Sequence, residues 1–171
     1  MKSVKAIAIC AAVALTGCAS AYKNTYTVAA VTKSVVDEAH LTYSNQLNQQ
    51  LNECDPQRNP DSKVTNKGEL DECMGPAFKK DTVDAVTSAV SAYYWSSVVA
   101  SAVLSGCEIP EKVEGEEPKP IDPKTCVKRA FTDDEFKEQR KLIIDSSIEF
   151  LELIPEGNKT IDKLKKLLPK R

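Results

Sequence analysis

Cysteine, histidine and carboxylate side chains are the groups in this chain that could carry out chemistry. The sequence holds six cysteines but a single histidine, His40. Structural zinc sites use closely spaced cysteine pairs or several histidines, and the chain contains no Cys-x-x-Cys motif. We therefore expect no metal site of this kind. The acidic segment after Asp61 also departs from a calcium-binding loop, because Lys63 and Lys67 stand where oxygen ligands are required.

His40 fits a structural role better than that of a general base. It follows Val36 by four residues and precedes Tyr43 by three, so it lies on or beside the apolar stripe of a predicted helix. No serine stands in a Gly-x-Ser-x-Gly motif, and no phosphate-binding or dinucleotide-binding motif is present. Asp133 and Asp134 stand at a helix start, where capping explains them. We therefore expect a protein that acts by binding, without a catalytic site or a cofactor.

The first eighteen residues have the pattern of a bacterial export signal. Lys2 and Lys5 precede an apolar run at residues 6–15 that is too short to span a membrane. The run ends in Leu-Thr-Gly-Cys at residues 15–18, which resembles the lipobox of bacterial lipoproteins. The resemblance implies a signal peptide of residues 1–17, cleavage before Cys18, and acylation of this cysteine at its thiol and its new amino terminus.

The residues after Cys18 indicate a destination. Ala19 and Ser20 follow it, whereas an aspartate at this place favours retention at the inner membrane in Gram-negative lipoproteins. We therefore expect a stable lipid anchor in the outer membrane, a tether of residues 18–21 and a mature domain in the periplasm.

Removal of Lys2 and Lys5 with the signal peptide leaves 23 − 2 = 21 basic against 25 acidic side chains. A nucleic-acid partner, which needs a net basic surface, is not expected.

Four cysteines remain in the exported chain, and an even number predicts disulfides. Cys54 and Cys73 stand before an uncharged segment that is predicted to be helical, and Cys107 and Cys126 stand at its far end. Over residues 83–105 such a helix rises by roughly 33 Å, whereas the Cα atoms of bridged cysteines lie within about 7 Å of each other. Only Cys54–Cys73 and Cys107–Cys126 are compatible with this length. Each bridge would stabilise the fold by roughly 3 kcal/mol.

Apolar residues at spacings of three and four predict helices at residues 22–53, 77–106, 133–154 and 160–168. Thr132 and Glu135 form a capping box at the start of the third helix. The connection at residues 54–76 is rich in turn formers, and that at residues 107–130 places four prolines in an acidic stretch. The latter is either a linker or a recognition loop. We predict one all-α domain over residues 22–171: an antiparallel, up-down-up three-helix bundle with a short C-terminal fourth helix.

The helix at residues 77–106 could in principle be buried in the bundle or span a membrane. Residues 85–107 carry no charge, and this uncharged segment is long enough to span a membrane. However, Ser and Thr recur throughout this segment and only one leucine occurs. We therefore expect a buried helix with its seam near Val86, Ser97 and Leu104.

The opposite side of this helix carries Trp95 and Val99, and Tyr94 stands beside them as a further candidate for partner binding. Three groups could cover this side: the C-terminal helix, a partner protein or second copy, or a lipid or other apolar ligand. We expect the C-terminal helix to do so. The function predicted from the sequence is that of a small helical adaptor, assembly or exclusion factor for a protein of the cell envelope. The alternative is a carrier of an apolar ligand in the bundle core.

Overall fold

The computed structural model shows an all-helical protein over the residues that it describes, which are 3–113, 116 and 119–168, with side chains from Ser20 onward apart from that of residue 167. This part of the chain forms five helices: α1 (Ser3–Cys54), α2 (Lys67–Met74), α3 (Lys80–Ser105), α4 (Asp133–Leu153) and α5 (Gly157–Leu167). Its one β-bridge pairs Cys107 with Lys128. The predicted all-α class is therefore confirmed.

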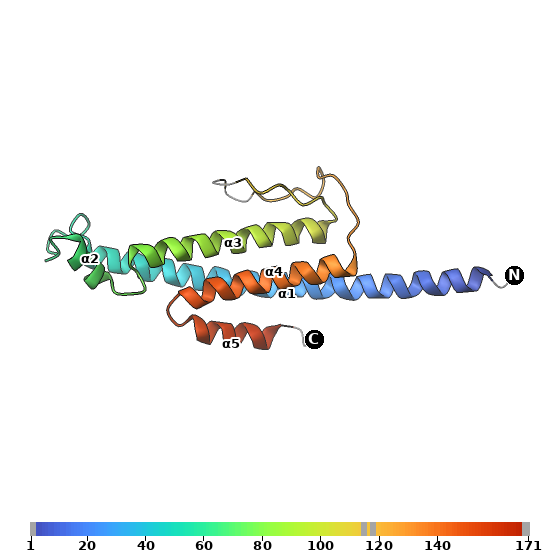
Figure 1. Ribbon diagram of the computed structural model, residues 1–171, viewed down its shortest axis with the longest axis horizontal. Helices are drawn as coiled ribbons and strands as arrows, with labels where there is room; N and C mark the ends of the chain where they lie inside the picture. Colours follow the sequence, from blue (N-terminus) through green and yellow to red (C-terminus); the bar gives the residue numbers. More distant parts are fainter. Residues whose placement is uncertain (1–2, 114–115, 117–118, 169–171) are drawn as a thin grey trace.

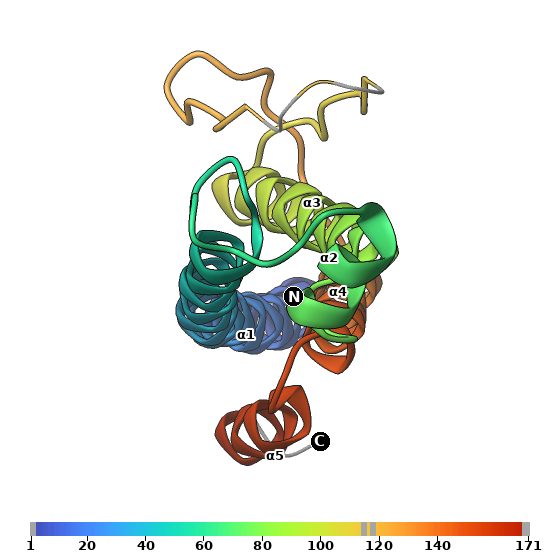
Figure 2. The ribbon, with the colours of Figure 1, turned by 90° about the vertical axis from the view of Figure 1, so that its left-hand side faces the viewer.

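The helices α1, α3 and α4 lie alongside one another (Figure 1). Helix α5 packs against α1 and α4 on the side that faces away from α3, as the end-on view shows (Figure 2). None of the described helices is long and apolar enough to cross a membrane.

The main hydrophobic core joins four of the helices. Its largest fully buried side chains are Val28 and Val36 of α1, Tyr93 of α3, Ile143, Phe150 and Leu151 of α4, and Leu164 of α5. Burial of a Val, Leu, Ile or Phe side chain stabilises a fold by roughly 1.5–3 kcal/mol, so α5 is an integral part of the bundle. A second, smaller cluster is formed by Ala21, Val99, Val103 and Phe136, with Trp95, Leu104 and Phe131 packed against it.

Both predicted disulfides are present. Their Cα–Cα distances are 5.8 Å for Cys54–Cys73 and 5.6 Å for Cys107–Cys126, within the range that a bridge requires. The two disulfides stand at opposite ends of α3, and the loop closed by the second one runs back alongside α3 (Figure 1). The bridges therefore fix the connections into and out of α3, and one cysteine of each, Cys54 and Cys107, is buried.

Local signals explain where the later helices begin and end. The predicted capping box of α4 is formed: the Thr132 hydroxyl accepts a hydrogen bond from the Glu135 amide, and the Glu135 carboxylate accepts one from the Thr132 amide at 2.8 Å. Helix α3 ends at Ser105 and is followed by Gly106, whose φ of 62° is readily adopted by glycine. Gly157 is the first residue of α5, and a Cβ atom there would lie 1.5 Å from the Leu151 carbonyl oxygen. Only glycine therefore permits α5 to turn back so closely.

The connection predicted as a loop at residues 54–76 contains a helix, α2. The Asn66 side chain accepts a hydrogen bond from the Glu69 amide, and the Glu69 carboxylate accepts one from the Thr65 amide. This reciprocal capping outweighs the turn-forming residues around it. The expectation of a purely irregular loop was therefore wrong.

The amino-terminal end of α1 differs from the expected arrangement. Residues 1 and 2 and the side chains of residues 3–19, including Cys18, lie outside the described part, so the predicted signal peptide and anchor fall there. The backbone of α1 is helical from Ser3 onward. Residues 18–21 consequently belong to the same helix as the packed body, whereas the sequence led us to expect a separate tether before residue 22.

Candidate functional site

A groove of about 670 Å³ lies between α1, α3 and a segment that returns over α3. We call it the α1–α3 groove. Its lining comes from Lys33 and His40 of α1, from Thr87, Val90, Ser91, Tyr94, Ser97, Val98 and Ser101 of α3, and from Pro120 and Ile121 of the returning segment. Its volume falls within the range of roughly 300–1,000 Å³ that is typical of small-molecule sites.

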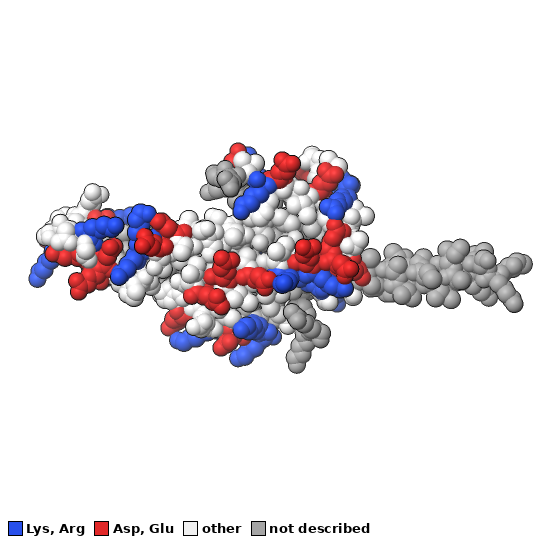
Figure 3. All heavy atoms as spheres, viewed as in Figure 1, with Lys and Arg blue, Asp and Glu red and all other residues white. Residues whose placement is uncertain are grey.

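Helix α3 supplies most of the groove because its uncharged residues recur at helical spacing. Thr87, Ser91, Tyr94, Ser97 and Ser101 follow one another at steps of three and four residues, which places their hydroxyls along one side of the helix. Figure 3 shows acidic and basic side chains mixed around α2 and around the start of α4, with a largely uncharged band along α3 between them. The groove is thus apolar and hydroxyl-rich rather than charged.

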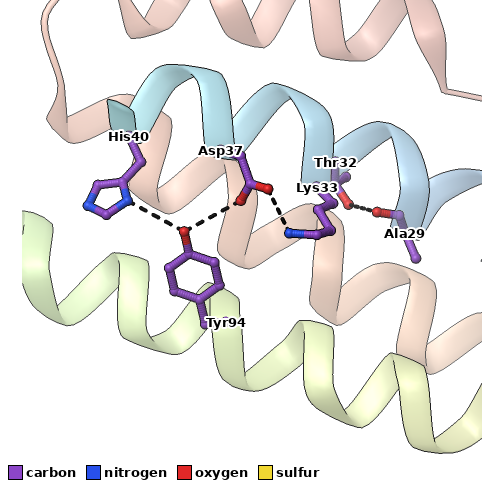
Figure 4. Close-up of polar contacts among 6 residues, drawn as sticks. All are labelled: Ala29, Thr32, Lys33, Asp37, His40 and Tyr94. Carbon is purple, nitrogen blue, oxygen red and sulfur yellow. Dashed lines mark hydrogen bonds and ion pairs between the residues drawn. The ribbon is translucent and has the colours of Figure 1, made fainter. Parts of the chain in front are cut away.

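Four side chains form a polar chain at the α1 side of the groove (Figure 4). The Lys33 ammonium lies 2.6 Å from Asp37 Oδ2, and the Tyr94 hydroxyl donates to Asp37 Oδ1 at 3.4 Å. His40 Nδ1 lies 3.4 Å from the same hydroxyl. Because that hydroxyl has one proton and gives it to Asp37, the contact with His40 requires a proton on Nδ1. The two contacts of 3.4 Å are long for hydrogen bonds, so this chain orients Tyr94 only loosely.

The protonation of this chain follows from its surroundings. Burial raises the pKa of the Tyr94 hydroxyl, and the negative charge of Asp37 raises it further. The hydrogen bond to Asp37 raises the pKa of the Lys33 ammonium. Both groups therefore keep their protons at neutral pH. The Lys33 ammonium has further protons to donate to whatever enters the groove, whereas the Tyr94 proton is already given to Asp37.

The segment that covers the groove is held at both ends. We call residues 108–125 the strap, of which residues 114, 115, 117 and 118 are not described. Next to the Cys107–Cys126 disulfide, the Glu108 amide donates to the Val127 carbonyl and the Arg129 amide donates to the Gly106 carbonyl, each at 2.9 Å. These bonds hold together the two ends of the strap, which runs back along α3 (Figure 1). The sequence predicted an extended excursion here but not that it would return over α3.

The side of α3 that carries Trp95 and Val99 is not a free surface. Val99 is buried, and Trp95 packs half-buried against a cluster that contains Ala21 and Phe136. The expectation that the C-terminal helix covers Trp95 was wrong, because the close turn at Gly157 directs α5 onto α1 and α4. The first turn of α4 covers this side of α3 instead.

The other predicted site residues are also placed by the structure. Tyr94 lines the groove, as does His40, whose ring is half-buried and meets the Phe150 ring edge-on at 6.1 Å. The expected seam of α3 was partly wrong: Val86 is buried, but Ser97 lines the groove. Sequence reasoning missed the groove itself, although the hydroxyls at helical spacing on α3 were a signal for it.

A second hollow, of about 480 Å³, lies beside α2 and includes Glu53, Asp61, Glu69 and Glu72 in its lining. Within the described residues, no three His, Cys, Asp or Glu side chains are placed to hold a metal ion together. Comparison with known proteins gives no match, whether to a family model, to a curated protein or to a solved structure. Fold and site therefore define the class on their own: over its described residues, this is an all-helical, disulfide-bonded protein with a largely uncharged groove along its third helix.

Proposed function

We propose that this protein is a lipid-anchored binding protein of the cell envelope that holds a segment of a partner protein in the α1–α3 groove. Acylated Cys18 would anchor it in the outer membrane, with the mature domain in the periplasm. The Leu-Thr-Gly-Cys sequence at residues 15–18 supports the anchor. The two disulfides support an exported, oxidising location, since such bonds are rare in reducing compartments. The role would be that of an adaptor, assembly or exclusion factor.

The observation that carries this proposal is the composition of the groove. Val90, Val98 and Ile121 offer apolar contact, while the row of hydroxyls along α3 offers donors and acceptors. Among the described lining residues, Lys33 alone carries an ammonium, and it is paired with Asp37. An extended peptide suits such a surface, because its backbone amides and carbonyls pair with hydroxyls and its apolar side chains fill the space between them.

The experiment is to block the groove with one large side chain. Ser101→Trp fills it from α3, and Ser88→Trp is the matched control, since Ser88 is exposed on the same helix but does not line the groove. Both variants are made in a soluble Cys18→Ser form that carries a photocrosslinker at Thr87. We expect the Ser88→Trp form to crosslink one envelope protein in cells and the Ser101→Trp form to lose that product. Equal crosslinking by both forms would contradict the groove as the binding site.

The size of the groove supports a second candidate, the carriage of a small apolar ligand. A cavity of about 670 Å³ accommodates a drug-sized molecule, although it lies beside the core and not within it as first expected. Native mass spectrometry of the protein purified from cells distinguishes the two candidates. A bound small molecule that the Ser101→Trp variant lacks would favour the carrier, whereas an empty protein with a crosslinked partner favours the adaptor.

We also infer that α1, α3 and α4 follow one another in the up-down-up order of an antiparallel three-helix bundle. Two observations support this order: the three helices lie side by side, and the two disulfides close connections that start at opposite ends of α3 (Figure 1). In such a bundle the strap reaches the groove from the end where α4 begins.

A further inference from the structure

The first turns of α1 after Cys18 have few charges for a chain in which 28% of the residues are charged. Lys23 is the only charged residue between positions 19 and 32, and no acidic residue occurs before Asp37. Tyr22 and Tyr26 lie on this stretch with 44% and 59% of their surface exposed. Because they are four residues apart, they share one side of the helix. Tyrosine, with an apolar ring and a polar hydroxyl, is enriched at the boundary between bilayer and water.

The helix connects this stretch rigidly to the body of the protein. Ala21 is 7% exposed and belongs to the second core cluster. Thr25 is fully buried, and its hydroxyl lies 3.2 Å from the Phe136 carbonyl of α4. Since α1 is helical from Ser3 to Cys54, a lipid on Cys18 would be attached only three residues from the packed core. An anchor at that place restricts the orientation of the bundle as well as its distance from the membrane.

Helix geometry decides which orientation brings the tyrosines to the bilayer. At 1.5 Å per residue, Tyr22 lies roughly 6 Å and Tyr26 roughly 12 Å along α1 from Cys18. The headgroup region of one leaflet is roughly 5–7 Å thick. An upright helix would therefore bring only Tyr22 among the headgroups, whereas a helix tilted toward its tyrosine side brings both.

We propose that the Tyr22–Tyr26 side of α1 rests on the surface of the bilayer that holds the acyl chains of Cys18. This inference rests on the proposed lipid anchor. This side of α1 would contact the layer of lipid headgroups. The anchor would then set the orientation of the groove relative to the membrane.

The charges beside this surface indicate which lipids it suits. The Tyr22 ring meets the Phe136 ring edge-on at 6.2 Å, so the start of α4 lies next to it. The acidic residues there are partly neutralised by basic neighbours: Asp134 pairs with Lys137 at 2.9 Å, and Glu135 pairs with Arg129. A mixed surface of this kind is compatible with zwitterionic headgroups and needs no anionic lipid.

Fluorescence quenching tests the orientation directly. The oxidised mature chain, residues 18–171, is coupled through its remaining free thiol at Cys18 to a maleimide-bearing phospholipid in phosphatidylcholine vesicles with brominated acyl chains. Trp95→Phe removes the native tryptophan, and Tyr26→Trp introduces a probe. Leu41→Trp in the same background is the control, since Leu41 is 63% exposed on the same helix but roughly 34 Å from Cys18. We expect several-fold stronger quenching of the Tyr26→Trp probe.

Two results would overturn the inference. One is equal quenching of both probes while flotation shows that both proteins are on the vesicles and circular dichroism shows that both are folded. The other is unchanged quenching of the Tyr26→Trp probe after a Gly-Ser linker is inserted between Cys18 and Ala19. A flexible linker removes the constraint, so this result would overturn the statement that the anchor sets the orientation. The proposed anchor fails separately, if mass spectrometry of the protein from cells finds no acyl group on Cys18. The chemical coupling makes the vesicle result independent of that outcome.

Discussion

Two neighbouring tyrosines of α3 show how differently a hydroxyl can be used. The Tyr94 hydroxyl contacts Asp37 and His40 at the edge of the groove. The Tyr93 hydroxyl is buried, with the hydroxyls of Thr32 and Ser97 close by, yet neither completes a hydrogen bond to it. A buried polar atom without a partner costs stability, so the two side chains should respond differently to loss of their oxygen.

We expect Tyr93→Phe to keep or increase the free energy of unfolding, by up to about 1 kcal/mol, because it removes an unsatisfied group. Tyr94→Phe should lower it by about 0.5–1 kcal/mol, because it removes hydrogen bonds. Urea denaturation of the two variants beside the parent protein measures both changes. Clear destabilisation by Tyr93→Phe would show that its hydroxyl has a partner.

Burial also makes Tyr93 a source of instability at alkaline pH. It raises the pKa of the hydroxyl above its ordinary value of 10.0. As the pH rises above that value, the unfolded chain loses this proton before the folded protein does, so stability falls. The Tyr93→Phe variant should therefore lose less stability above pH 10 than the parent protein loses, which the same denaturation experiment measures.

At the scale of elements, a feature encoded within a few residues could be predicted where no competing signal stood beside it, whereas features that depend on the packing of neighbouring elements could not. The capping box of Thr132 and Glu135 is local, and α4 begins where it indicates. The same kind of capping at Asn66 and Glu69 starts α2, but turn formers on both sides obscured it. The groove could not be predicted, because the rotation of α3 about its axis depends on how α1 and α4 pack against it. The position of α5 depends on the close approach at Gly157, which no sequence pattern reveals.

The α4 cap gives the protein a pH dependence that can be measured. The hydrogen bonds from Thr132 to the Glu135 carboxylate lower its pKa below the ordinary value of 4.5. The carboxylate therefore contributes stability that is complete above pH 4.5 and is lost as the pH falls through the lowered pKa. We expect Glu135→Gln to reduce the loss of stability between pH 5 and pH 2.5, as followed by urea midpoints. Glu138→Gln, an exposed position on the same helix, serves as the control and should follow the parent protein.

At the scale of the whole molecule, the two disulfides are alike in sequence separation but not in what they hold. Both join cysteines 19 residues apart. Cys54–Cys73 closes the connection that contains α2, away from the groove, whereas Cys107–Cys126 fixes the ends of the strap over it. Reduction of the second bridge should therefore affect the groove more than reduction of the first.

We expect the double substitution Cys107→Ser with Cys126→Ser, and likewise Cys54→Ser with Cys73→Ser, to lower the free energy of unfolding by roughly 3 kcal/mol. Only the former should increase labelling of a cysteine introduced at Val98, which lines the groove together with Ile121 of the strap. Thiol labelling of the folded proteins, with the remaining native disulfide of each variant intact, measures this difference. Equal labelling in both double variants would show that the strap stays in place without its disulfide.

The core places residues from both ends of the described chain in contact. Val28 and Val36 share their cluster with Ile161 and Leu164. A nascent polypeptide therefore lacks part of this core until Ile161 and Leu164 have been synthesised. Such a chain stays open during translation, which is the form that a translocation channel for unfolded proteins accepts.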